Sequence, residues 1–147
     1  MAIPDYDALG NLPEGDHEAT LTEVKERYAY NFRRREIYDG LTHVVGLLRL
    51  KAVETVWLDG SYVTSKIRPS DADVIFVPPA GQDTTTWDLL SPVRRADLKR
   101  YYRVDLWEFP SCGRHGRSFS KSMTIKEFFG SDENDQPKGM ILLVWEG

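Results

Sequence analysis

The sequence predicts an α/β or α+β sandwich in which a sheet is covered by helices. Two segments with a helical spacing of apolar residues come first, and short runs rich in β-branched and aromatic residues follow. The chain has 147 residues, of which 41% are hydrophobic, enough for the core of one domain. The predicted order is helix, helix, strand, strand, helix, strand, helix, strand, which fits layers of helices on a sheet.

Composition and charge argue against several classes of protein. A formal net charge of -4 argues against a chain that holds duplex nucleic acid by bulk charge alone. Cys112 is the single cysteine, which rules out an intrachain disulfide and a zinc site built on paired cysteines. We expect a cytoplasmic protein without a signal peptide, because the first residues are acidic and no apolar run approaches the roughly 20 residues that span a membrane.

The first helices are predicted from capping and periodicity. Residues 1–19 are rich in proline, glycine and aspartate and predict an extended N-terminal arm. Thr20-Leu21-Thr22-Glu23 has the spacing of a capping box, so a helix begins there and ends near Tyr30. A second helix is predicted over residues 33–50, where the apolar residues that recur at helical spacing are Ile37, Leu41, Val44, Val45 and Leu48.

The remaining elements alternate between strands and short helices. Ser91-Pro92 predicts the start of a third helix, since serine caps helices and proline suits the first helical position. We expect a turn or short helix over residues 61–66 and a last short helix over 124–129. Four strands are predicted, over residues 53–58, 73–77, 102–109 and 140–145.

Gly60 and Ser61 directly follow the first predicted strand. A glycine lets the backbone approach a phosphate closely. If Ser61 opens a short helix, backbone N–H groups point at an anion and the serine hydroxyl can donate to it. The same two residues also suit an ordinary turn and helix cap. Taken alone, the pair favours the ordinary turn.

Asp71 and Asp73 open the second predicted strand and share one face of it, because side chains at i and i+2 point the same way. Two neighbouring carboxylates repel each other unless a cation intervenes, and Mg²⁺ suits such a pair. An acidic turn is the alternative. Asp73, however, lies directly against an apolar run, where a charge must be paired or functional. The pair therefore favours a metal site.

Together these segments resemble the nucleotidyltransferase superfamily related to DNA polymerase beta. Its signature is an apolar strand, Gly-Ser, a spacer, and Asp-x-Asp before apolar residues. Here it reads Val56-Trp57-Leu58-Asp59-Gly60-Ser61 and then Asp71-Ala72-Asp73-Val74-Ile75. The specific motif covers residues 56–77. The resemblance implies one nucleotidyltransferase-like domain over residues 1–147, with a mixed sheet of about four to five strands flanked by helices.

The chain is most similar to small single-domain prokaryotic and phage members, the minimal nucleotidyltransferases, some of which pair with toxins. Among these it resembles an uncharacterised group with Asp-Gly-Ser-(Phe/Tyr)-Val-Thr before the acidic pair. The matching segments are Leu12-Pro13-Glu14-Gly15, Arg34-Arg35 and Asp59-Gly60-Ser61-Tyr62-Val63-Thr64. The resemblance implies an enzyme dependent on Mg²⁺ or Mn²⁺. It would move a nucleoside monophosphate from ATP, or another nucleoside triphosphate, to a hydroxyl of a protein or RNA. A toxin–antitoxin or phage-defence system would be its setting.

By this resemblance Asp71 and Asp73 bind the metal. Asp105 completes the site and accepts the proton of the attacking hydroxyl, because the family has a third carboxylate on a later strand. Glu108 is the fallback for that third position. The other interpretation of Asp105 is an aspartate at a strand end paired with Arg103 or Lys99.

Nucleotide binding is assigned to Gly60, Ser61, Lys66 and Arg68. The two basic residues lie in the spacer, where they either contact phosphates or offset the negative charge nearby. Asp59 departs from the family pattern, which has an apolar residue there. It either helps to bind metal or hampers nucleotide binding. The basic segment Arg114–Lys121 is either a surface loop or a grip for a triphosphate or an acceptor RNA.

Two other functions stay open. A catalytically inactive module with the same fold would neutralise a partner protein, such as a cognate toxin or antitoxin, or sense a nucleotide. A metal-dependent hydrolase is favoured less, because hydrolysis does not require the Gly-Ser pair. The sequence selects neither the nucleotide, nor the acceptor, nor the oligomeric state.

Overall fold

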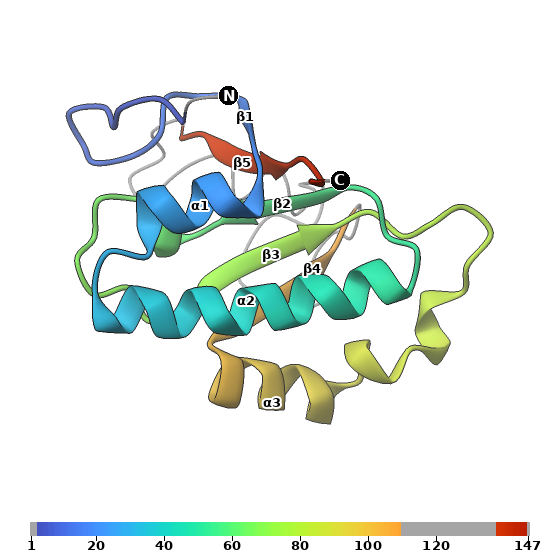
Figure 1. Ribbon diagram of the computed structural model, residues 1–147. Coiled ribbons are helices and arrows are strands. Elements are labelled where there is room, and N and C mark those ends of the chain that lie inside the picture. Colours follow the sequence, from blue (N-terminus) through green and yellow to red (C-terminus); the bar gives the residue numbers. More distant parts are fainter. Residues whose placement is uncertain (1–2, 110–137, 147) are drawn as a thin grey trace.

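A five-stranded mixed sheet in the order β1-β5-β2-β3-β4 is the centre of the molecule (Figure 1). The computed structural model describes residues 3–109 and 138–146. Pairing is parallel between β1 and β5 and between β3 and β4, and antiparallel between β2 and both of its neighbours. The strands are β1 (Asp16–Ala19), β2 (Val56–Asp59), β3 (Ala72–Phe76), β4 (Val104–Glu108) and β5 (Met140–Leu143). The predicted α/β class with a mixed sheet is confirmed.

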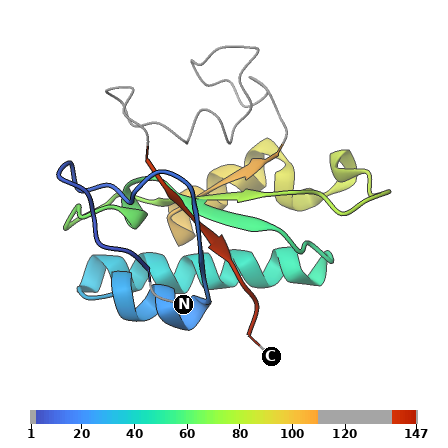
Figure 2. The same ribbon diagram turned by 90° about the horizontal axis from the view of Figure 1, so that it is seen from above.

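Three α-helices accompany the sheet: α1 (Leu21–Tyr28), α2 (Phe32–Leu50) and α3 (Pro92–Tyr102). Helices α1 and α2 lie on the same side of the sheet, and α3 contacts α2 and β4 (Figures 1 and 2). The predicted capping box is present at α1, because the Thr20 hydroxyl accepts from Glu23 N at 3.1 Å and Thr20 N donates to the Glu23 carboxylate at 3.0 Å. Asn31 and Ser91 cap α2 and α3 in a similar way.

Apolar side chains cover both faces of the central strands. Val56, Leu58 and Val74 belong to the main core between the sheet and the helices. The alternate positions Trp57, Ile75 and Trp107 form a second apolar cluster with Met140 on the other face. Strands that are buried on both faces read as continuous apolar runs, which explains why β2, β3 and β4 are recognisable in the sequence.

The predicted N-terminal arm is wrong for its last four residues, which form the edge strand β1 instead. Asp16 pairs with Met140 and Ala19 with Leu143 in parallel register along β5. The segment Asp-His-Glu-Ala has neither β-branched residues nor apolar alternation, so it carries no strand signal. Backbone hydrogen bonds to β5 give it the strand conformation, and an edge strand does not need apolar residues on both faces.

Element ends differ by one to three residues from the predictions. The third helix extends through Tyr102, so β4 begins at Val104 rather than at residue 102. Arg103 ends the helix in the left-handed conformation, with φ 56°. The predicted helix 124–129 and the basic segment Arg114–Lys121 lie outside the described residues. No helix in the described ranges combines the length and the apolar character that a membrane span requires.

Gly40 of α2 is required by a close approach of two elements. A Cβ atom at this position would lie 1.9 Å from the Tyr102 carbonyl oxygen, whereas a Cβ at Gly46 of the same helix would meet nothing within 4 Å. We expect Gly40→Ala to lower the free energy of unfolding by about 1–3 kcal/mol through overpacking. Gly46→Ala should raise it by about 0.5–1 kcal/mol, because alanine is the better helix former.

Urea denaturation of both variants and the wild-type protein measures the two changes. Equal shifts of the two variants in the same direction would contradict the close approach of α2 to the end of α3.

Candidate functional site

Three aspartates stand side by side on neighbouring strands. Asp59 pairs with Asp73 across β2 and β3, and Asp73 pairs with Asp105 across β3 and β4. Residues paired in register point to the same face of a sheet. This face also carries Trp57 and is opposite to the face that α1 and α2 cover. All three aspartates are buried, with exposures of 0%, 9% and 7%. We call them the aspartate row.

Asp71 lies directly before β3 and joins this group through a lysine. The ammonium of Lys99 on α3 is 3.8 Å from Asp71 Oδ2 and 3.7 Å from Asp105 Oδ2. Arg95, one turn earlier on α3, places its guanidinium 3.6 Å from Asp105 Oδ1. The structure therefore brings together Asp71, Asp73 and Asp105, the three residues predicted to bind metal. It also shows the pairing of Asp105 with Lys99 that was the alternative interpretation.

Asp73 occupies the centre of the row and is tightly enclosed. Its Oδ1 accepts a hydrogen bond from Trp107 Nε1 at 3.3 Å. Its Oδ2 lies against Gly60, where an added Cβ would be only 2.4 Å away. Burial, together with the negative charges of Asp59 and Asp71, raises the pKa of Asp73 to about 7. Asp73 is thus a carboxyl group whose ionisation lacks a full compensating charge.

From the sequence, Asp59 either helps to bind metal or hampers nucleotide binding. The structure buries its side chain completely. The ammonium of Lys138, just before β5, is 3.3 Å from Asp59 Oδ1. Within the described residues neither carboxylate oxygen has a hydrogen bond of good geometry, so Lys138 compensates the charge through proximity. Burial raises the pKa of Asp59 to about 7, and the positive charge of Lys138 opposes that rise. A fully buried side chain does not contact a ligand from solvent in this arrangement.

Gly60 and Ser61 lie at the end of β2 beside Asp73. Gly60 adopts φ 83°, a conformation that favours glycine, and Ser61 opens a three-residue 3₁₀ helix, Ser61–Val63. The glycine is therefore required for two local reasons, its backbone angle and the room it leaves for the Asp73 carboxylate. Both reasons hold without a phosphate, so the cradle that the sequence predicts remains a prediction.

Lys66 and Arg68 are exposed and do not join the aspartate row. Lys66 takes part through its backbone, whose carbonyl accepts from Arg34 Nε at 3.1 Å. Arg68 lines a surface hollow at the N-terminus of α2, together with Arg33 and Arg103. The structure therefore separates the predicted nucleotide-binding cations from the carboxylates, although both groups lie at the same end of the sheet.

From the sequence, Lys99 is an alternative partner of Asp105, whereas Arg95 and Lys138 have no predicted role. Arg95 and Lys99 are four residues apart on α3, which places them on one side of the helix. The helix immediately precedes the strand with Asp105, and this i, i+4 pattern was the available signal. No sequence pattern predicts the contact of Lys138 with Asp59, because it joins segments that are distant in the sequence.

Arg34, which belongs to the matching segment Arg34-Arg35, fixes the conformation of the segment after Gly60-Ser61. It is fully buried and donates to the Tyr62 carbonyl at 2.6 Å and to the Thr64 carbonyl at 2.7 Å. These bonds hold the segment that follows Gly60-Ser61 against the start of α2. Within the described residues, Arg34 donates to backbone carbonyl oxygens, and the sequence does not indicate which carbonyls a buried arginine will meet.

A divalent cation suits the donors but not their present spacing. Asp71, Asp73 and Asp105 offer the carboxylate oxygens that Mg²⁺ prefers, and Asp73 has surplus negative charge near it. In residues 3–109 and 138–146, however, no three His, Cys, Asp or Glu side chains stand close enough to hold a metal ion. The ammonium of Lys99 takes the place between Asp71 and Asp105. Because Lys99 is half exposed, its side chain has room to leave.

The raised pKa of Asp73 gives a stability prediction with a definite sign. The folded protein holds this proton up to about pH 7, whereas the unfolded chain loses it near pH 4. Stability is therefore lost as the pH rises through this window. Asp73→Asn keeps the acceptor for Trp107 and removes the charge. We expect it to raise the free energy of unfolding by roughly 1–3 kcal/mol at pH 8 and by much less at pH 5.

Urea denaturation at both pH values measures this difference. Asp88→Asn, which alters an exposed carboxylate in the 3₁₀ helix Asp88–Leu90 that precedes α3, is the matched control and should show no such pH dependence. A wild-type protein that gains stability over Asp73→Asn as the pH rises would contradict the assignment.

Comparison with known proteins identifies a family. Residues 4–144 match a family described as a family of unknown function, DUF6932. Neither a curated protein nor a solved structure matches the chain. The match covers nearly the whole sequence, including β1 to β5 and the aspartate row. The chain therefore belongs to the DUF6932 family.

Proposed function

We propose that this protein is a nucleotidyltransferase that depends on a divalent metal ion. The observation that supports the proposal is the position of Asp71, Asp73 and Asp105 at one end of β3 and β4, directly beside Gly60. Asp71 and Asp73 lie at the start of β3 and Asp105 lies on the parallel strand β4, and the family resemblance implied that the three converge. Carboxylates that share a site in this way serve in metal-assisted transfer of phosphoryl groups.

The reaction would transfer a nucleoside monophosphate. An acceptor hydroxyl oxygen attacks the α-phosphorus of ATP or another nucleoside triphosphate, the bond from that phosphorus to the bridging oxygen breaks, and pyrophosphate leaves. Asp105 would take the hydroxyl proton, and Asp71 and Asp73 would hold Mg²⁺ or Mn²⁺. The bound metal supplies positive charge to the attacking and leaving oxygens. Arg95 and Lys99 of α3 add positive charge at the same edge, where a triphosphate brings negative charge.

Lys99 has two positions in this proposal. Without ligand, its ammonium lies between Asp71 and Asp105 and offsets their repulsion. A metal ion held by Asp71 and Asp73 would take the place of the lysine ammonium, which could then contact the phosphates. A long, half-exposed lysine side chain can make this change at small cost. The acceptor, a protein or an RNA, and the toxin–antitoxin or phage-defence setting remain predictions from the resemblance.

One observation favours the second candidate, a module of the same fold without catalysis. Asp71 and Asp105 are paired with basic side chains, and the described carboxylates do not form a ready metal site. If these ion pairs are permanent, the protein would bind a partner or a nucleotide and transfer nothing. The two candidates differ in whether a metal ion displaces Lys99.

Displacement of Lys99 is measurable directly. We expect Lys99→Met to tighten Mn²⁺ binding by about tenfold, because it removes an ammonium that competes for two carboxylates. Isothermal titration calorimetry with Mn²⁺ alone gives the affinity. Lys51→Met, at the end of α2, is the matched control and should leave it unchanged. Equal or weaker Mn²⁺ binding by Lys99→Met would favour the module without catalysis.

Transfer itself is tested with nucleoside triphosphates labelled at the α-phosphate, Mg²⁺ or Mn²⁺, and mixtures of candidate protein and RNA acceptors. We expect label on an acceptor, and Asp71→Asn should reduce its rate at least about 100-fold because a metal ligand is lost. Asp88→Asn is the control and should retain the wild-type rate. Absence of label with each of the four nucleotides, or full activity of Asp71→Asn, would contradict the proposal.

A further inference from the structure

A basic hollow lies at the same end of the sheet as the carboxylates. It has a volume of about 480 Å³. Among the described residues its lining includes three arginines and one acidic residue, Glu36, although the whole chain has a net charge of -4. We call it the arginine hollow, and its lining residues are Asn31, Phe32, Arg33, Glu36, Ile67, Arg68 and Arg103.

The floor of the arginine hollow is held by hydrogen bonds between α2 and the segment that precedes β3. Asn31 Nδ2 donates to the Ile67 carbonyl at 2.8 Å. Arg33 donates to the Pro69 carbonyl at 3.4 Å. Glu36 accepts from Arg103 Nε at 2.8 Å and so ties the end of α3 to α2. The hollow is therefore formed before a ligand arrives, which reduces the entropy cost of binding.

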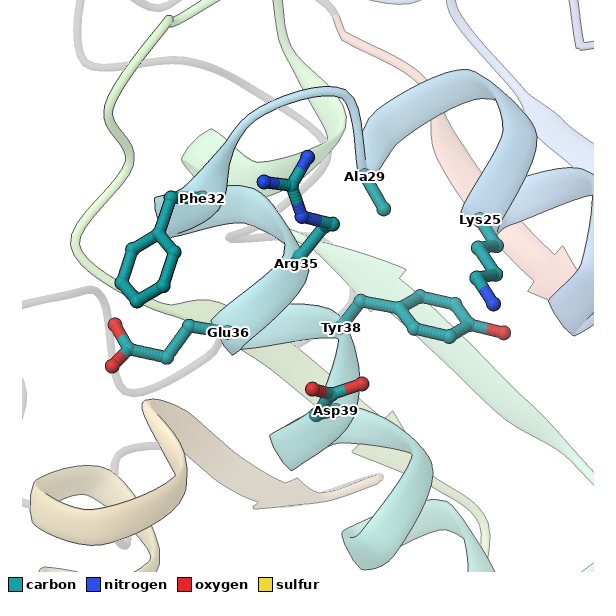
Figure 3. Close-up of a pocket in the computed structure, with 7 residues that line it drawn as sticks. All are labelled: Lys25, Ala29, Phe32, Arg35, Glu36, Tyr38 and Asp39. Carbon is teal, nitrogen blue, oxygen red and sulfur yellow. The ribbon is translucent and has the colours of Figure 1, made fainter.

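Two large apolar side chains are exposed at this basic surface. Phe32 is 76% exposed and Ile67 is 69% exposed. Phe32 is shared with a second hollow of about 380 Å³ that continues along α2 toward α1 (Figure 3). In Figure 3 the Phe32 ring stands beside Glu36 on the outer side of α2, and Arg35 and Tyr38 follow along the helix. A flat aromatic surface among arginines is the arrangement on which bases of single strands stack.

The position of the hollow connects it to the aspartate row. Arg68 precedes Asp71 by three residues, and Arg103 precedes Asp105 by two. The Ala72 N–H donates to the Arg103 carbonyl at 3.0 Å, so the two segments lie together at this edge. A chain of phosphates bound by the arginines would therefore end near Asp71 and Asp105.

We propose that the arginine hollow and the neighbouring α1–α2 hollow bind a short single strand of nucleic acid, with a base on Phe32 and phosphates on Arg33 and Arg68. Duplexes are disfavoured because paired bases cannot stack on the ring. Identification of this strand as the acceptor of the nucleotide rests on the proposed function, whereas its binding does not.

Fluorescence anisotropy tests the binding with labelled strands of about twelve nucleotides, as RNA, as DNA and as duplex DNA of one sequence. EDTA removes divalent metal ions and so prevents nucleotide transfer. A low salt concentration of about 50 mM potassium chloride keeps the electrostatic attraction between phosphates and arginines strong. We expect single strands to bind more tightly than the duplex. Phe32→Ala should weaken binding at least about fivefold and Phe32→Trp should restore it. Tighter binding of single-stranded RNA or of single-stranded DNA shows which sugar the site prefers, and either result supports the proposed site.

Arg68→Ala should reduce the slope of log affinity against log salt by about 0.7, because one phosphate contact is lost. Arg94→Ala, an exposed arginine at the start of α3 outside both hollows, is the matched control and should bind as the wild-type protein does. All these side chains are exposed or line a surface, and thermal unfolding of each variant checks that the fold is unchanged. Equal loss in Arg94→Ala and Arg68→Ala, equal binding of duplex and single strand, or no binding of either strand would overturn the inference.

The two proposals can fail separately. Binding that depends on Phe32, together with no label transfer to any acceptor, would leave the hollow in place and remove the transferase. No binding of either single strand, together with label transfer to a protein acceptor that is unchanged in Phe32→Ala, would remove the nucleic-acid inference and keep the transferase.

Discussion

The structure depends on how the protein holds three aspartates in register on adjacent strands. Asp59, Asp73 and Asp105 point to one buried face, where repulsion between like charges and loss of hydration both disfavour ionisation. Basic side chains compensate the outer members of the row, namely Lys138 at Asp59, and Lys99 at Asp105. The central carboxyl, Asp73, accepts a hydrogen bond from Trp107 Nε1 and carries a raised pKa. A cation added beside Asp73 would offset the repulsion that Asp59 and Asp71 exert on it.

The same constraint explains features that otherwise look unrelated. Gly60 lacks a side chain where the Asp73 carboxylate needs space. A larger residue at position 60 would therefore displace the Asp73 carboxylate. Arg34 then holds the segment after that turn by donating to carbonyl oxygens from inside the protein. Because a buried guanidinium with neutral acceptors requires many well-placed hydrogen bonds, the turn has little freedom to move. A site for phosphates benefits from this rigidity.

The aspartate row and the arginine hollow lie at the same end of the sheet. The acidic side chains gather on the face away from α1 and α2, and the arginine hollow lies at the start of α2. Short connections from Arg68 to Asp71 and from Arg103 to Asp105 join the two regions. Such an arrangement suits a long anionic substrate, which can place most of its charge on arginines and only its reacting end near carboxylates and metal.

The sequence by itself determined the α/β class, the capping box of α1, the length of α2 and the strand with Asp73, because these depend on local spacing. Asp105 followed from the family resemblance, since it is an aspartate in an apolar strand where the family has its third carboxylate. Only the tertiary structure decided that β1 joins the sheet, that Lys99 and Lys138 compensate the row, and that Arg68 faces α2 rather than the carboxylates. These contacts join segments far apart in the chain, and the charge of a residue does not indicate which distant partner it will meet.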